Sequence, residues 1–395
     1  MQGKFMIEKL NRLKDHYFLS QPHQAFFMLA FSNALLSMVL FLLLMEGTIS
    51  AIVPSKLYHA YSLIYLLFTP AIFAFLFTTF PRFSVTEPIL KKDYLRVFSF
   101  FLLGSLFLVL GLFISIPLFY TGIFLTFMGH AFALKELYVI YKKSTVADKE
   151  DQFWILTATS FGLFSHLLFL LSLWIPSLYV FSVQISIYLY LFLLFFTVAQ
   201  RMVPFFSHTP ITKHKERFKV IVGLLGLHVF LELLQVNASF LVDFVLAYLF
   251  MRELARWKLP FPNENPLVWI LHIALFWIPL AFVLAGLTSV LALFYDLNFL
   301  YLAIHALALG FFLTMLIGFG TRVTLGHSGN VMFADSYTKY LFYWTQVVVL
   351  LRIMTSFAND FLLLLELSIF AWLLLFLAWG VRFFAVLIFG KKLKP

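Results

Sequence analysis

The sequence has no cysteine and is poor in charged residues. The absence of cysteine excludes disulfides, iron–sulfur clusters, thiolate metal sites and the covalent attachment of c-type haem. Charged residues make up only 12% of the chain and hydrophobic residues reach 63%, whereas about a quarter of a soluble domain is charged. We therefore interpret residues 1–395 as a single polytopic membrane domain of all-α structure, in contact with the lipid bilayer.

Apolar runs long enough to cross a bilayer recur along the chain. A spanning helix needs about 20 apolar residues, and on this basis the sequence predicts twelve transmembrane helices. Their expected ranges are 24–46, 57–80, 95–116, 119–141, 152–174, 178–200, 218–235, 238–256, 266–293, 299–321, 338–357 and 361–388.

The net charge of +10 is explained by the distribution of basic residues over the loops. If the N-terminus is cytoplasmic, only Lys56 and Arg352 of the 28 lysines and arginines fall in the outer half. Cytoplasmic loops of membrane proteins carry an excess of Lys and Arg. The pattern therefore predicts a multi-pass protein of the bacterial inner membrane with both termini cytoplasmic, and it gives no indication of nucleic-acid binding.

Similar residues end the second, sixth and tenth expected helices. Pro81 and Pro204 lie 123 residues apart, and Leu325 follows Pro204 after 121 residues, each within three residues of an arginine. Each interval spans four helices. Because parallel repeats are common in membrane proteins, the spacing predicts three pseudo-repeated four-helix modules, roughly 20–145, 146–260 and 261–390.

Two of the eleven histidines lie at matched depth on repeat-related helices. His59 is near the outer end of the second expected helix, and His305 is near the outer end of the tenth. Haem b held by two imidazoles takes them from opposite faces of the porphyrin. The sequence therefore predicts His59 and His305 as the axial ligands of one haem b. The alternative is that each histidine only forms a hydrogen bond across helices.

Small residues recur every four positions on the tenth expected helix. Gly310, Thr314 and Gly318 precede Arg322 at this spacing, which is typical of a close helix-packing face. His305 lies well over 100° from Gly310 at about 100° per residue. We therefore expect His305 to point away from the packing face.

Arg352 lies unusually deep on the outer side of the eleventh expected helix. A lone charge at that depth is costly. Two interpretations stay open: the arginine pairs with one of the carboxylates Glu232, Asp243 and Glu366, or it contacts a haem propionate.

Three further histidines share a depth near the cytoplasmic face. His23, His272 and His327 lie on the first, ninth and tenth expected helices. They predict a polar cluster, which is either a second metal or haem site, with copper as one candidate, or a hydrogen-bonded network at helix ends. Both interpretations stay open.

Several segments resemble, in order, the motifs of the NnrS family. The most specific runs from His305-Ala306-Leu307 through Thr314-Met315 to Thr321-Arg322-Val323-Thr324-Leu325-Gly326-His327-Ser328-Gly329. The others are Pro22-His23-Gln24-Ala25-Phe26-Phe27, Arg201-Met202-Val203-Pro204-Phe205-Phe206 and Trp269-Ile270-Leu271-His272, together with the second helix. The resemblance covers nearly the whole chain.

The resemblance implies a haem- and copper-containing membrane protein linked to nitric oxide metabolism. The family's Trp-His-x-His-Glu segment reads Tyr58-His59-Ala60-Tyr61-Ser62 here, so His59 is present and the second histidine and the glutamate are not. A more distant likeness is to the catalytic subunit of haem–copper oxidases, but the three copper histidines of their sixth and seventh helices are missing. Turnover and the redox partner stay open, and the competing function is a transporter or channel without a cofactor.

Overall fold

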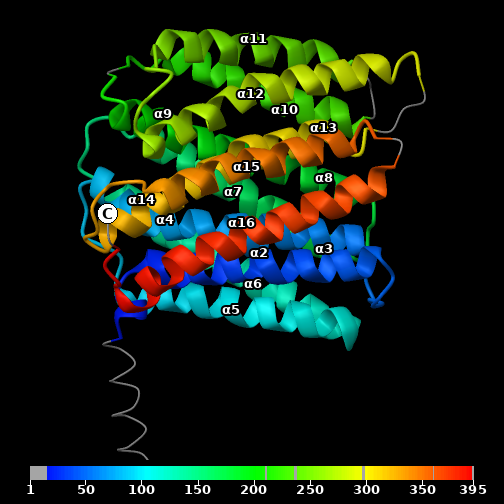
Figure 1. Ribbon diagram of the computed structural model, residues 1–395, viewed down its shortest axis with the longest axis horizontal. Helices are drawn as coiled ribbons and strands as arrows, with labels where there is room; N and C mark the ends of the chain where they lie inside the picture. The colour runs from blue at the N-terminus through cyan, green and yellow to red at the C-terminus, as the bar shows by residue number, and fades with distance from the viewer. Residues whose placement is uncertain (1–15, 210, 235–237, 296–298, 359, 394–395) are drawn as a thin grey trace, which may run out of the picture. The chain divides into compact units, whose positions relative to one another are not determined.

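The computed structural model describes residues 16–209, 211–234, 238–295, 299–358 and 360–393, and every regular element within them is helical. The elements are η1 (Tyr17–Leu19), α2 (Pro22–Met45), α3 (Ser55–Tyr61), η2 (Ser62–Phe68), α4 (Thr69–Phe83), α5 (Lys91–Phe113), α6 (Ile116–Lys143), α7 (Glu150–Leu171), α8 (Leu178–Gln184), η3 (Ile185–Phe192), α9 (Leu193–Phe206), α10 (Lys215–Leu233), α11 (Ser239–Trp257), α12 (Pro266–Leu291), α13 (Leu302–His305), η4 (Ala306–Leu313), α14 (Thr314–His327), α15 (Ser336–Thr355) and α16 (Phe361–Phe389) (Figure 1). The all-α class is confirmed.

Three long helices contain a π-helical segment and continue through it without a break. They are α3–η2–α4, α8–η3–α9 and α13–η4–α14. When each is counted once, the twelve expected spans fall on twelve continuous helical stretches of the described chain. Nine of these described stretches are long and apolar enough to cross a membrane. The chain is therefore a multi-pass helical membrane protein.

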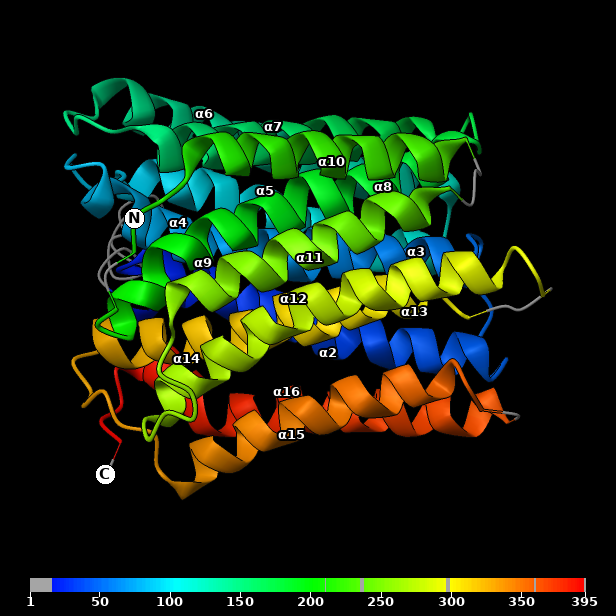
Figure 2. The ribbon, with the colours of Figure 1, turned by 90° about the horizontal axis from the view of Figure 1, so that it is seen from above.

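Internal contacts divide the chain into two compact units. Unit 1 comprises Met1–Gln152, Gly320–Phe333 and Phe376–Pro395, and unit 2 comprises Phe153–Phe319 and Ala334–Leu375. Unit 1 contains α2 to α6, and unit 2 contains α8 to α13 and α15, with α11 and α12 side by side (Figure 2). Helices α7, α14 and α16 each contribute residues to both units.

In unit 1, glycines bring α5 and α6 into direct backbone contact. A Cβ atom built on Gly111 would overlap the backbone of Phe119, and one on Gly122 would lie 2.6 Å from the backbone nitrogen of Leu108. Only two residues join the helices, and the Ser115 side chain accepts a hydrogen bond from the Leu118 backbone at the start of α6. Small residues at such contacts let helices approach closely in a membrane.

The three π-helical segments begin at nearly constant intervals. Ser62 to Ile185 is 123 residues, and Ile185 to Ala306 is 121. In a π-helix each N–H pairs with the carbonyl five residues earlier, which changes the regular α-helical pairing. Polar side chains donate to carbonyls inside these segments: Asn33 to Leu66, Thr69 to Ile64 and Thr314 to Leu309.

The same three helices also end alike. The carbonyls of Pro81, Pro204 and Leu325 each accept a hydrogen bond from the backbone five residues later, at Thr86, Thr209 and Asn330. The residue before each donor, Val85, His208 or Gly329, has a positive φ. This is a Schellman-type cap, which satisfies carbonyls left unpaired at a helix end. Its positions repeat the 123- and 121-residue intervals.

In unit 2, the small-residue face of the tenth expected helix packs against α12. A Cβ on Gly310 would lie 2.5 Å from Trp277, and one on Gly318 would lie 2.5 Å from Leu271. Both partners are on α12. The expected close-packing role of these two glycines is confirmed.

Candidate functional site

His305 is the last residue of α13 and directly precedes η4. Its Nδ1 lies 2.9 Å from the Tyr301 carbonyl oxygen and 3.1 Å from Nη2 of Arg352. A ring nitrogen either donates or accepts, so these two contacts are alternative hydrogen bonds. Metal-bound histidines usually donate their second N–H to a carbonyl or carboxylate, which fixes the ring. The Tyr301 carbonyl is placed to orient His305 in this way.

The backbone before His305 adopts a sparsely populated conformation. Leu300 and Tyr301 both have positive φ, 48° and 58°. This region of backbone conformation favours glycine. A non-glycine residue in it raises the free energy of the fold by about 1–3 kcal/mol, which contacts with the surrounding structure must offset. The turn directs the Leu300 carbonyl to Arg352, whose Nη2 donates to it at 2.7 Å. The strained turn therefore links Arg352 to the backbone that carries His305.

Arg352 is a buried cation, 8% exposed, on α15. Besides Leu300 and His305 it contacts the Ser356 hydroxyl at 3.4 Å. Within the described residues no carboxylate pairs with it, and Asp243, one of the three candidates from the sequence, lies instead 2.7 Å from His228. Because all the described partners of Arg352 are neutral, its positive charge is suited to pair with an anionic group that is not part of the chain.

His59 belongs to unit 1, whereas His305 and Arg352 belong to unit 2. The half-buried His59 ring on α3 packs against Phe41 of α2, with ring centroids 4.2 Å apart and planes at 30°. His59 lies three residues before η2, so it is offset by two positions from His305 relative to the π segments. That offset is about 3 Å along a helix. Their pairing on one haem stays a prediction.

One premise of the orientation expected for His305 is wrong. Gly310 and the residues before it, from Ala306 on, form η4, and a π-helix takes more residues per turn than an α-helix. The angle of about 100° per residue therefore does not apply between His305 and Gly310. Gly310 still faces α12, but the direction of His305 follows from its contacts with Tyr301 and Arg352, not from helical spacing.

In unit 1 the structure brings His23 and His327 together. Their ring centroids are 5.1 Å apart with planes at 46°, joining the start of α2 to the end of α14. His23 is 1% exposed, and its Nδ1 has no hydrogen-bond partner among the described residues. The positive charge of Arg82 on α4 acts on both rings. The charge of Arg82 disfavours a metal cation bound between the two rings. The Nδ1 atom of His23, which has no hydrogen-bond partner among the described residues, favours a bound group.

His272 lies in unit 2, on α12, and is fully buried. Its Nε2 is 2.7 Å from the Ser207 hydroxyl, which is also 2.8 Å from the Val203 carbonyl. If Ser207 donates to that carbonyl, its oxygen accepts from Nε2–H, which leaves Nδ1 with the lone pair. This Nδ1 has no hydrogen-bond partner in the described part of the chain.

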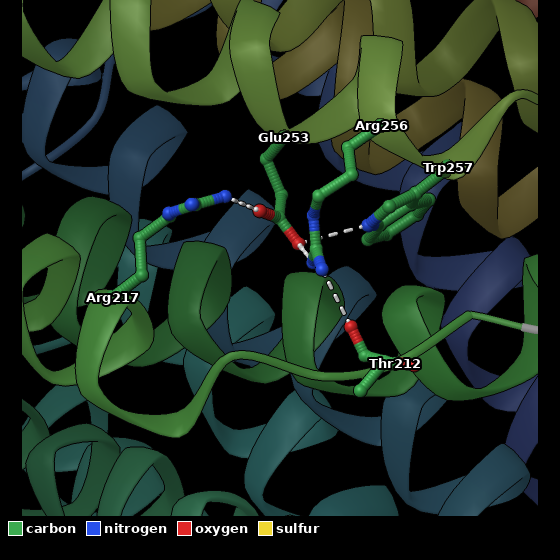
Figure 3. Close-up of polar contacts among 5 residues, drawn as sticks. All are labelled: Thr212, Arg217, Glu253, Arg256 and Trp257. Carbon is green, nitrogen blue, oxygen red and sulfur yellow. Dashed lines mark hydrogen bonds and ion pairs between the residues drawn. The ribbon is translucent and has the colours of Figure 1, made fainter.

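An ion cluster that the sequence did not indicate joins α10, α11 and the preceding loop. Glu253 accepts hydrogen bonds from Arg217 at 2.7 Å, from the Trp257 indole at 3.0 Å and from Arg256 (Figure 3). Arg256 also donates to the Thr212 carbonyl at 2.7 Å. The carboxylate is therefore shared by two arginines and holds the ends of two helices to a loop.

Replacing Glu253 by alanine is expected to lower the free energy of unfolding by about 3 kcal/mol, because both arginines lose their carboxylate partner. The matched control is Glu216→Ala. Glu216 also pairs with a cation, Lys219, but its side chain is 84% exposed, so the expected loss is about 0–0.5 kcal/mol. Thermal unfolding in detergent measures both, and equal losses would contradict the structural role of the cluster.

The comparison with known proteins agrees with the motifs noted in the sequence. Residues 17–389 match the sequence model of the family described as NnrS protein. No curated protein matches the chain. Because the family match extends over nearly the whole chain, this protein belongs to the NnrS family.

Proposed function

We propose that this protein binds haem b in the membrane and acts in nitric oxide response or in membrane redox chemistry. The observation that carries the proposal is the family match over residues 17–389. Two features of unit 2 support it: His305 is oriented through Nδ1 by a backbone carbonyl, and the buried Arg352 has only neutral partners among the described residues.

In this proposal the chain's own residues hold and orient the haem. His305 and His59 would be the ligands of the haem iron, and Arg352 would neutralise a propionate. The Tyr301 carbonyl fixes the ring of His305. When bound, a haem with two imidazole ligands supplies a one-electron redox couple. A haem held by two histidines would be suited to electron transfer, and we assign it to that role with an unidentified redox partner.

The visible spectrum of the protein purified in detergent tests this function. Reduction with dithionite is expected to give b-type bands from one haem per chain. A colourless protein that is fully folded would overturn the proposal and favour a transporter or channel without a cofactor. Metal analysis of the same preparation distinguishes the two interpretations of His23, His272 and His327. Copper or a second haem would support a cofactor site, and neither would support a hydrogen-bond network alone.

We also propose twelve spans in three modules, with both termini on the cytoplasmic side of the bacterial inner membrane. The 123- and 121-residue intervals support the modules, because π segments and helix caps both recur at them. The concentration of basic residues in alternate loops supports the topology. A C-terminal reporter that is active only in the periplasm would contradict it.

A further inference from the structure

Inside unit 1, the start of α2 lies against the end of α14. A Cβ atom built on Gly320 of α14 would lie 3.9 Å from the Phe27 ring of α2. Nearer the end of α14, the His327 ring lies 5.1 Å from the ring of His23, which precedes Phe27 by one helical turn. The two helices therefore run antiparallel here, and the side chains between these two contacts share one interface.

Three buried side chains of this interface each have a polar atom without a partner in the described part of the chain. The atoms are Nδ1 of His23, Nε2 of Gln24 and Oγ1 of Thr324. Each of these residues is at most 1% exposed. A buried polar atom without a partner is rare in a folded protein and calls for a bound water or ion. Three such atoms in one contact indicate a bound polar group that is not part of the chain.

The orientation of the Gln24 amide is fixed by the cap of α2. Its Oε1 accepts hydrogen bonds from the Gln21 backbone N–H at 2.8 Å and from the Ser20 hydroxyl at 3.0 Å, so Nε2 keeps two N–H donors. Thr324 differs from a buried threonine such as Thr197, which donates to the carbonyl four residues earlier at 2.7 Å. The amide and the hydroxyl can therefore both donate to one bound group.

The electrostatics of this interface favour a negative group. Arg82, in the last turn of α4, has a positive charge that acts on both His23 and His327. The first turn of α2 has no acidic residue, and a helix N-terminus attracts anions. A positive charge and N–H donors disfavour a metal cation. They suit an oxyanion, and a phosphate group has several oxygens that accept from donors on two helices at once.

We propose that the start of α2 and the end of α14 form a binding site for a phosphate group. The Gln24 amide, the Thr324 hydroxyl and Nδ1–H of His23 donate to its oxygens, and Arg82 supplies the positive charge. The group is either inorganic phosphate or the headgroup of a phospholipid, since both present the same oxygens. The site does not depend on the proposed haem, which other residues would bind.

Thermal unfolding of the purified protein in detergent, at increasing inorganic phosphate and constant ionic strength, tests the site. A ligand of the folded state raises the unfolding temperature with its concentration, which gives Kd. We expect phosphate to stabilise the wild type and Thr324→Val to raise Kd about tenfold or more, because a hydrogen bond to a charged group is lost. The matched control is Thr345→Val. Thr345 is also fully buried but donates to the Leu341 carbonyl at 2.9 Å, so Kd should not change.

Two further variants keep the proposal testable if this valine variant does not fold. Arg82 is exposed, so Arg82→Gln should fold, and it is expected to raise Kd about fivefold. Arg96→Gln removes the same charge from α5, where Arg96 pairs with Asp93, and should leave Kd unchanged. Gln24→Glu keeps an oxygen for the helix cap but replaces the amide donor by a negative oxygen, so it is expected to abolish binding.

Removal of phospholipid by detergent exchange separates the two sources of the phosphate group. Stabilisation by phosphate before and after removal identifies a free anion, and stabilisation only after removal identifies a headgroup that occupied the site. Three results would overturn the proposal: no stabilisation by phosphate in either preparation, the same Kd for the wild type and Thr324→Val, or a stoichiometric copper ion or second haem that is lost in His23→Gln. The last would make His23 a metal ligand instead.

Discussion

Replacing His305 by alanine is expected to abolish the low-spin b-type spectrum of the purified protein. Alanine provides no nitrogen to the iron, and it also removes the Nδ1 atom that lies beside the Tyr301 carbonyl and Arg352. His59→Ala is expected to have the same effect, since low-spin haem b requires both axial imidazoles. Reduced-minus-oxidised spectra, normalised to folded protein by gel filtration, provide the measurement.

The control for these variants is His208→Ala. His208 is exposed in the loop after α9, so its loss should leave the spectrum intact. Free imidazole added to His305→Ala or His59→Ala should restore part of the low-spin signal, because it supplies the missing nitrogen. If either variant keeps a full low-spin spectrum, the assignment of that histidine is wrong even if haem is present.

Replacing Gly111 by alanine is expected to cause the largest loss of stability among single-methyl changes in unit 1. The added Cβ would overlap the backbone of Phe119, and backbone atoms cannot rotate out of the way as a side chain can. Overpacking of a well-packed contact typically costs about 1–3 kcal/mol, and we expect about 3 kcal/mol or more here. Thermal unfolding in detergent, monitored by circular dichroism, measures the change.

Two matched controls for Gly111→Ala lie on α10. A Cβ on Gly223 or Gly226 would meet nothing within 4 Å. Because alanine favours a helix over glycine by about 0.5–1 kcal/mol, Gly223→Ala and Gly226→Ala should leave stability unchanged or raise it. If Gly111→Ala lowers the unfolding temperature no more than these two controls do, α5 and α6 do not need their close contact.

The helices could be predicted from the sequence because bilayer thickness and apolar length fix them. Their ends are less exact: the third expected span ends at residue 116 and the fourth begins at 119, whereas α5 ends at Phe113 and α6 begins at Ile116, where Pro117 suits the first turn of a helix. The π segments could not be predicted, because they depend on contacts distant in sequence, such as the donation from Asn33 to Leu66. An angle of 100° per residue therefore cannot give the relative directions of two side chains when a π segment lies between them. This is why the expected angle between His305 and Gly310 does not hold.

The candidate site was predictable only where depth along a helix was enough. Shared depth grouped His272 and His327 with His23, and the structure places the rings of His23 and His327 5.1 Å apart, whereas His272 belongs to unit 2 and its place in the cluster stays a prediction. Depth could not indicate partners across helices. Asp243 stood out in the sequence as a deep carboxylate, but its contact with His228 depends on how α10 and α11 pack against each other.

The short connection between α5 and α6 also has a consequence for biogenesis. Ile114 and Ser115, the two residues between the helices, carry no charge and give the insertion machinery no topological signal. Orientation then depends on the basic residues at the far ends, Lys91 and Lys92 on α5 with Lys142 and Lys143 on α6. Both ends are held on the same side, and the glycine contacts require the helices to be paired. We therefore expect the two helices to enter the bilayer together as one hairpin during synthesis.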